Sequence, residues 1–178
     1  MNDMRHMRIS FLGLILIFAS LLNTSVAYGK NHSPNRKRLL TTLRTCTPNP
    51  RGAICENAIE EAIKRFNRGD KALLRPLIAL GPNSDAFVAE MLGDFYGNTL
   101  WKSPRLFLRA IADYPKKEQK EIAWHAATMD GGGMSDKMVS DIKLSLGKLA
   151  GEPRRRVGES AKVCLREIET ANKKGSKP

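Results

Sequence analysis

Apolar residues recur every three or four positions along most of the chain between residues 36 and 172. This spacing places them on one face of a helix. No run shows the strict alternation of apolar and polar residues that is typical of half-buried strands. The pattern therefore predicts an all-α protein of about eight short helices.

Two of the apolar stripes indicate how the predicted helices would pack. Consecutive helices are expected from Ser84 to Met129, and another helix from Ala53 to Asn67. The core-facing residues expected after Ser84 are Phe87, Val88, Met91, Leu92, Phe95 and Tyr96. Those expected in the helix from Ala53 are Ile54, Ala58, Ile59, Ala62, Ile63 and Phe66. Each stripe would bury one side of its helix against a neighbour.

Short polar residues stand where several helices should begin. Ser84, Ser103 and Ser135 are suited to accept a hydrogen bond from a backbone N–H of the first turn, and Asp70 is suited in the same way. Pro104 follows Ser103 at the first helical position, where proline is favoured. The connectors are short, which favours antiparallel neighbours. We expect stacked antiparallel hairpins similar to helical repeats, with an irregular bundle as the alternative.

The first 27 residues have the layout of a secretory signal peptide. Arg5 and Arg8 precede the apolar run Ile9–Leu22, and small residues then lead to a cleavage position after Ala27. A run of about 14 apolar residues is short for a membrane helix, which needs roughly 20. Cleavage after Ala27 is therefore expected, and an uncleaved membrane anchor is the alternative.

The remaining chain has a simple expected organisation. Residues 28–35 should form a flexible arm, residues 36–172 a single helical domain, and residues 173–178 a disordered basic tail. No stretch after the signal is apolar enough to cross a bilayer. We expect an exported protein that works in the periplasm or outside the cell.

The chain has three cysteines, and an oxidising compartment would favour one disulfide among them. Cys46 and Cys55 bracket a loop with two prolines and a glycine, whose turns bring the pair together. We therefore favour Cys46–Cys55, with Cys55–Cys164 as the alternative. Cys164 lies among apolar residues, which raise the pKa of a thiol and argue against a catalytic cysteine.

The chain is strongly basic, with 30 Lys and Arg against 18 Asp and Glu, for a net charge of +12. Cations gather where helices should begin, although they oppose the helix dipole there. This position is compatible with anion binding, while an ordinary solvated basic surface is the favoured interpretation. The cations of two such helix starts are Lys116, Lys117, Lys120, Arg154, Arg155 and Arg156. Aromatic residues make up only 6% and do not interleave these clusters, which argues against single-stranded nucleic acid.

A second anion site is conceivable in the loop formed by Gly131, Gly132 and Gly133, which precedes a predicted helix. Backbone N–H groups at such a position can bind phosphate or carboxylate. The strand and the Gly-Lys-Ser/Thr sequence of a phosphate loop are missing, however. A plain connector between helices is the alternative.

No catalytic, metal or cofactor motif is complete in the sequence, and we expect no cofactor and no metal. The leading hypothesis is an exported binding module without catalytic activity, whose partner is an envelope or extracellular protein held in a groove between hairpins. The alternative is a basic module that docks on an anionic polymer or membrane surface. A weaker third hypothesis is a hydrolase with a dispersed site around Glu90, Asp94 and His125.

Overall fold

The computed structural model describes residues 34–129, 134–153 and 155–175. It contains eight α-helices, two short 3-10 helices (η1 and η2) and no strand in these ranges, which confirms the all-α prediction. The elements are α2 (Pro34–Cys46), α3 (Ala53–Asn67), η1 (Lys71–Leu73), α4 (Leu74–Ile78), η2 (Gly81–Asn83), α5 (Ala86–Lys102), α6 (Pro104–Ile111), α7 (Lys116–Thr128), α8 (Asp136–Ala150) and α9 (Arg155–Gly175).

Two predicted boundaries shift in the structure. The first helix of the expected domain begins at Pro34, and α9 continues to Gly175, so the tail predicted to be disordered from Lys173 begins as helix. The predicted signal peptide (residues 1–27), residues 28–33 of the predicted arm and residues 176–178 lie outside the described residues.

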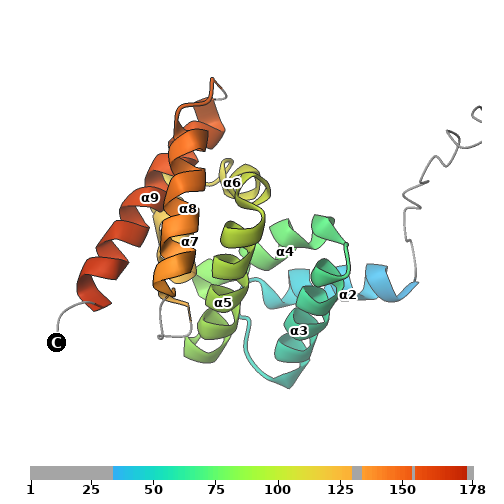
Figure 1. The fold of residues 1–178 in the computed structure, drawn as a ribbon. Coiled ribbons are helices and arrows are strands. Elements are labelled where there is room, and N and C mark those ends of the chain that lie inside the picture. The colour runs from blue at the N-terminus through green and yellow to red at the C-terminus, as the bar shows by residue number, and fades with distance from the viewer. Residues whose placement is uncertain (1–33, 130–133, 154, 176–178) are drawn as a thin grey trace, which may run out of the picture. The chain divides into compact units, whose positions relative to one another are not determined.

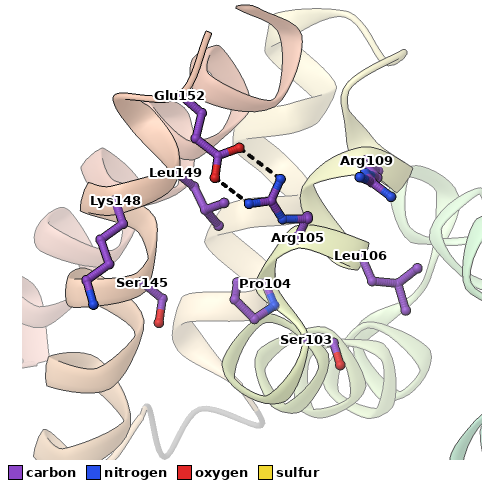
Figure 2. Close-up of a pocket in the computed structure, with 9 residues that line it drawn as sticks. All are labelled: Ser103, Pro104, Arg105, Leu106, Arg109, Ser145, Lys148, Leu149 and Glu152. Atoms are coloured by element: carbon purple, nitrogen blue, oxygen red, sulfur yellow. Dashed lines mark hydrogen bonds and ion pairs between the residues drawn. The ribbon is translucent and has the colours of Figure 1, made fainter. Parts of the chain in front are cut away.

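The helices alternate between two rows. One row holds α2, α4, α6 and α8, in which each helix contacts the next, and the other holds α3, α5, α7 and α9. Helices α2 and α3 lie together at one end of the array, and α8 and α9 at the other (Figure 1). Within the first row, Arg105 of α6 forms a two-point ion pair with Glu152, just after α8 (Figure 2). Among successive helices, α2 packs closely on α3 and α8 on α9, but α4 does not pack closely on α5, nor α6 on α7, so the described residues form an all-α bundle of short helices.

The core lies between the rows and is almost entirely apolar. Leu92, Leu100 and Phe107 are each no more than 1% exposed. Tyr96 is fully buried, and its hydroxyl donates a hydrogen bond to the backbone oxygen of Leu77 at 2.9 Å. Burial raises the pKa of Tyr96 well above its ordinary value, so the phenol stays protonated as a donor. The Tyr96 hydrogen bond thereby fixes α5 to α4.

Glycines set the close contact between α5 and α7. A Cβ atom added at Gly97 would lie 2.7 Å from the backbone oxygen of Ala126, and one added at Gly93 would lie 3.0 Å from that of His125. Cβ atoms do not approach a backbone oxygen so closely without a shift of one helix. The missing side chains of two glycines, four residues apart on one face of α5, therefore allow α7 to lie directly against it.

Of the predicted helix caps at Ser84 and Ser135, the structure confirms the one at Ser135. The side chain of Ser135 accepts a hydrogen bond from the backbone N–H of Met138 at 3.3 Å, as predicted for the start of α8. At the start of α5 the prediction is wrong by one residue, since Asp85 accepts from the N–H of Val88 at 3.0 Å. The Ser84 hydroxyl instead donates to the backbone oxygen of Gly81, because Ser84 ends the preceding 3-10 turn.

The other two predicted cap residues stand at the starts of η1 and α6, as predicted, but their side chains make no cap hydrogen bond. The carboxylate of Asp70 makes no cap and accepts two hydrogen bonds from Arg36, at 2.7 and 3.2 Å. Because this guanidinium binds both carboxylate oxygens, Asp70 joins η1 to α2 instead. Ser103 precedes Pro104 at the start of α6, but its side chain makes no cap hydrogen bond. Ser103 also ends α5, where its backbone N–H donates to the backbone oxygen of Thr99.

Two residues predicted to be buried are exposed, namely Ile54 at 77% and Phe87 at 56%. Ile54 precedes Cys55 on α3, and one residue turns the side chain by about 100° away from the buried stripe. Phe87 lies on the same face of α5 as Met91, Asp94 and Asn98, by its spacing of 4, 7 and 11 residues. That face of α5 borders a groove and not the core, as described below.

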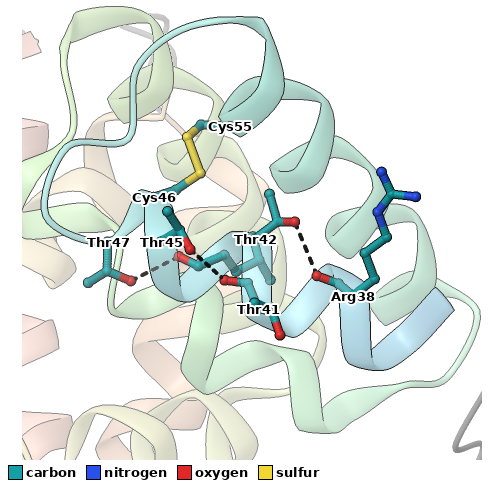
Figure 3. The surroundings of a disulfide bond; sticks show 8 residues. Arg38, Thr41, Thr42, Thr45, Cys46, Thr47 and Cys55 are labelled. Atoms are coloured by element: carbon teal, nitrogen blue, oxygen red, sulfur yellow. Dashed lines mark hydrogen bonds between the residues drawn. A yellow bond between two sulfur atoms is a disulfide. The ribbon is translucent and has the colours of Figure 1, made fainter. Parts of the chain in front are cut away.

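A disulfide joins Cys46, the last residue of α2, to Cys55 in the first turn of α3, which confirms the favoured pairing (Figure 3). Near it, the hydroxyls of Thr45 and Thr47 donate to backbone oxygens one turn earlier in the helix. Cys164 is free and fully buried. Burial raises the pKa of its thiol to about 12, so it stays protonated and unreactive.

Replacement of both Cys46 and Cys55 by serine is expected to lower the free energy of unfolding by about 2.5 kcal/mol, the loop-entropy value for a closed loop this short. Urea unfolding followed by circular dichroism measures the loss. Reductant should destabilise the native protein to the same extent and leave the double variant unchanged. Equal stabilities of native protein and variant would contradict a stabilising role for this disulfide.

Candidate binding surfaces

A groove of about 690 Å³ separates α3 from α5. Arg51, just before α3, and Asp85, just before α5, approach to 3.8 Å, and further along Phe66 packs on Phe95. The two helices therefore run in the same direction, side by side (Figure 1). The groove lies along the second halves of both helices.

The floor of the groove is apolar. The rings of Phe66 and Phe95 meet edge to face, with centroids 5.0 Å apart. Ile63 and Met91, which are partly buried against the core, line the groove beside them. The floor thus presents two aromatic and two aliphatic side chains from two facing helices.

The rim of the groove is polar and carries more cations than anions. Lys64 is paired with Glu60 at 3.1 Å. Lys71 donates to the backbone oxygen of Phe66 at 3.1 Å, and its ammonium lies 4.0 Å from the centroid of the Phe66 ring. Lys102 and Asp94 line the groove from α5. An apolar floor with a charged rim is the composition of surfaces that bind protein segments.

The side chains of α5 explain why the groove opens between α5 and α3 and not between α5 and α7. Toward α7, Gly93 and Gly97 let the backbones approach closely. Toward α3, the rings of Phe95 and Phe66 stand between the two helices. Packed rings keep two helices farther apart than glycine contacts do. The axes of α3 and α5 are therefore farther apart than those of α5 and α7.

The structure brings two of the predicted basic helix starts together. Asp113 accepts from Arg75 at 2.9 Å and from Arg156 at 3.1 Å, so the start of α9 lies beside the turn that precedes α7. Further along, the hydroxyl of Ser160 donates to the amide oxygen of Gln119 at 3.0 Å. Helices α7 and α9 therefore run in parallel, and their first turns lie together at one end of this helix pair.

The cations at this end are exposed but partly neutralised. They include Lys116, Lys117 and Lys120, together with Arg156. Asp113 already bridges Arg75 and Arg156, and Glu121 lies 3.9 Å from Lys117. Arg154, the side chain of Arg155 and the loop of Gly131, Gly132 and Gly133 lie outside the described residues.

The three residues of the dispersed hydrolase hypothesis are not gathered in one cavity. Asp94 lines the groove, whereas Glu90 and His125 do not. Glu90 is exposed, and His125 is partly buried. Burial lowers the pKa of His125, and the charge that opposes this shift is Glu121, one turn earlier on α7. The groove sets Asp94 among apolar side chains and lysines and not beside a histidine.

In the described part of the chain, no three His, Cys, Asp or Glu side chains are grouped so that they could hold a metal ion. None of the helices α2 to α9 is both long and apolar enough to cross a bilayer.

Comparison with known proteins identifies no relative from which a function could be transferred. No protein-family model matches the chain, and no curated protein or solved structure is significantly similar to it.

Proposed function

We propose that this chain is an exported binding protein, without chemistry of its own, whose α3–α5 groove holds an apolar segment of another envelope or extracellular protein. The observation that carries the proposal is the groove itself, with four apolar side chains on its floor and lysines on its rim. Its volume lies in the range typical of ligand-binding clefts.

Export is supported by two features of the chain. The N-terminal sequence has the order of a signal peptide, from positive to apolar to small residues. The disulfide between Cys46 and Cys55 would persist in an oxidising compartment, whereas cytosolic thiols are kept reduced.

The groove favours an amphipathic segment as its occupant. Apolar side chains spaced along one face of a partner helix would contact Phe66, Phe95 and Met91, as in other helix-in-groove complexes. The exposed ring of Phe87 continues the same face of α5 beyond the groove. Lys71 and Lys102 would favour acidic residues on the partner near the ends of α3 and α5.

A charge placed on the groove floor should abolish binding. Met91→Glu is expected to weaken capture of the partner at least about tenfold, because a bound apolar segment would bury an unpaired carboxylate. The matched control is Leu144→Glu, which alters an apolar residue that is 64% exposed on α8. A photo-crosslinking amino acid at position 98 on the groove, or at position 140 on α8, reports where the partner binds.

The proposal predicts one protein adduct from position 98 that persists at high salt, disappears with Met91→Glu and remains with Leu144→Glu. Unfolding curves of both variants establish that they are folded. Crosslinking that is equal from positions 98 and 140, or unchanged by Met91→Glu, would overturn the groove as the binding site.

The basic end formed by the first turns of α7 and α9 favours a second function, docking on an anionic polymer or a membrane surface. Lys116, Lys117, Lys120 and Arg156 converge there from two helices. Binding by these cations would weaken steeply with salt, because exposed charges are screened over about 8–10 Å at physiological ionic strength. Capture that is lost at high salt and is insensitive to Met91→Glu would favour this function over the groove.

A further inference from the structure

The side chains that line the α3–α5 groove have the spacing of helix packing. Those of α5 recur three or four residues apart from Met91 to Lys102, and those of α3 recur so from Glu60 to Asn67. A stripe with this spacing is the face that a helix presents to another helix. Phe87 extends the stripe of α5 by one turn, and the helix from Phe87 to Lys102 is about 22 Å long. The groove therefore offers two parallel helix faces to a third helix of about four turns.

Two cations line the end of the groove where α3 and α5 terminate. Lys102 is the last residue of α5, and Lys71 follows α3 and donates to the backbone oxygen of Phe66 at 3.1 Å. In the described residues, neither ammonium forms an ion pair with a carboxylate. Asp70, which precedes Lys71, is bound by Arg36 instead. This end of the groove thus carries two positive charges that a partner can neutralise.

The opposite end of the groove is acidic. Asp94 lines the groove from the first half of its α5 stripe, and Glu90 lies one turn before it. On α3, Glu56 lies one turn before Glu60, where the lining begins. The other charged groups here form two ion pairs of no net charge, namely Glu60 with Lys64 and Arg51 with Asp85. The charge along the groove therefore changes from negative to positive in the direction of both helices.

We infer that the segment held in this groove is a helix with an acidic first turn and a basic last turn, which runs antiparallel to α3 and α5. This inference rests on the binding function proposed for the groove. Acidic side chains of the bound helix would lie beside Lys71 and Lys102, and basic ones toward Glu56 and Glu90.

The direction of the bound helix follows from its dipole. Acidic residues stabilise the first turn of a helix and cations its last turn, so a stable helix with both groups has its N-terminus at the lysine end. There the positive partial charge of its first turn also meets the C-terminal ends of α3 and α5, where the partial charge is negative.

Two synthetic peptides of about 18 residues, or five turns, test the charge pattern. Both have the same composition, leucines on one face and a lactam bridge on the other, so that both are helical. The segregated peptide has two glutamates in its first turn and two lysines in its last turn, whereas the mixed peptide has one of each in both turns. The segregated peptide is expected to shift the methyl NMR signals of Ile63 and Met91 and to bind at least about fivefold more tightly, since several weak ion pairs act together.

A nitroxide spin label reports the direction of the bound peptide, because it broadens the NMR signals of nearby protons. On the first residue of the segregated peptide, the label should broaden the backbone amide signal of Lys102 more strongly than that of Phe87. On the last residue it should broaden the signal of Phe87 more strongly. These two amides lie at opposite ends of the α5 stripe.

Variants assign the preference to the lysine end. Lys71→Gln with Lys102→Gln is expected to reduce the preference for the segregated peptide to about twofold, because the charges of only one end remain. Lys162→Gln with Arg166→Gln is the matched control, since it removes two exposed cations of α9 and should leave the preference unchanged. Amide spectra of both double variants establish that they are folded.

Three results would overturn the inference, each at a different step. Equal affinities of the native protein for the two peptides would contradict the charge pattern and leave the groove as a site for apolar segments. Stronger broadening of Phe87 by the label on the first residue would reverse the direction. Unchanged signals of Ile63 and Met91 with both peptides would exclude a helix as the occupant. The crosslink from position 98 tests the proposed function separately, so its failure is distinguishable from these results.

Discussion

Leu92→Asp is expected to abolish the cooperative unfolding transition of the domain. Leu92 is 1% exposed and belongs to the apolar core of α5. A carboxylate at this position would be charged and unpaired, or protonated and without the packing of leucine. Either state costs several kcal/mol, a large part of the roughly 5–15 kcal/mol that stabilises an ordinary domain.

The measurement is a thermal and a urea unfolding curve, each followed by circular dichroism. Leu92→Met is the control, because it keeps the side chain apolar at similar volume and should cost less than about 1.5 kcal/mol. A sharp transition retained by Leu92→Asp at nearly the native midpoint would show that this side of α5 does not face the core.

Gly97→Val is expected to lower the free energy of unfolding by about 3 kcal/mol, at the upper end of the usual cost of overpacking. The new Cβ would lie 2.7 Å from the backbone oxygen of Ala126 and 2.8 Å from the Cγ atom of Met129. The Met129 side chain can move aside, but the backbone oxygen cannot move without displacing α7. The gain in helix propensity over glycine is only a fraction of this cost.

A second pair of variants tests the same point with a smaller change. Gly97→Ala should lower the free energy of unfolding, whereas Gly147→Ala should raise it by about 1 kcal/mol. Gly147 lies on an exposed face of α8, and a Cβ atom there would meet nothing within 4 Å. Because the two substitutions are chemically identical, their difference isolates the close contact of α5 and α7. Equal stabilisation by both would contradict that contact.

The helices and much of the core could be predicted from the sequence, because apolar spacing reports directly which face of a helix avoids water. Val88, Leu92 and Tyr96 are buried as their spacing predicts. The pairing of Cys46 with Cys55 was also accessible, since the loop between them is short and rich in turn-forming residues.

Helix ends were predicted less well, because several short polar residues compete to cap one turn. Asp85 caps α5 one residue after the predicted Ser84. Asp70 binds Arg36, which lies 34 residues earlier in the chain. No local sequence pattern shows that the carboxylate of Asp70 will bind a distant cation instead of the backbone N–H groups of the next turn.

The candidate sites were the least predictable feature. The groove exists because α5 presents small residues, Gly93 and Gly97, to α7 and a large ring, Phe95, to Phe66 of α3. The sequence does not show which neighbouring helix each face of α5 contacts. Met91 and Phe87 fit the helical period of a core stripe, and their position beside the groove follows only from how α3 is placed. A second pocket is lined by residues of α6 and α8, two helices that lie far apart in the sequence.

The sequence by itself determined that this protein is helical, where most of its helices lie and which residues form most of its core, because these follow from local periodicity. It favoured one cysteine pairing through short-range turns, and the structure decided between the two. Only the tertiary structure decided which helices touch and which stand apart. That choice depends on the sizes of side chains that meet across different helices, and it creates both the groove between α3 and α5 and the pocket between α6 and α8.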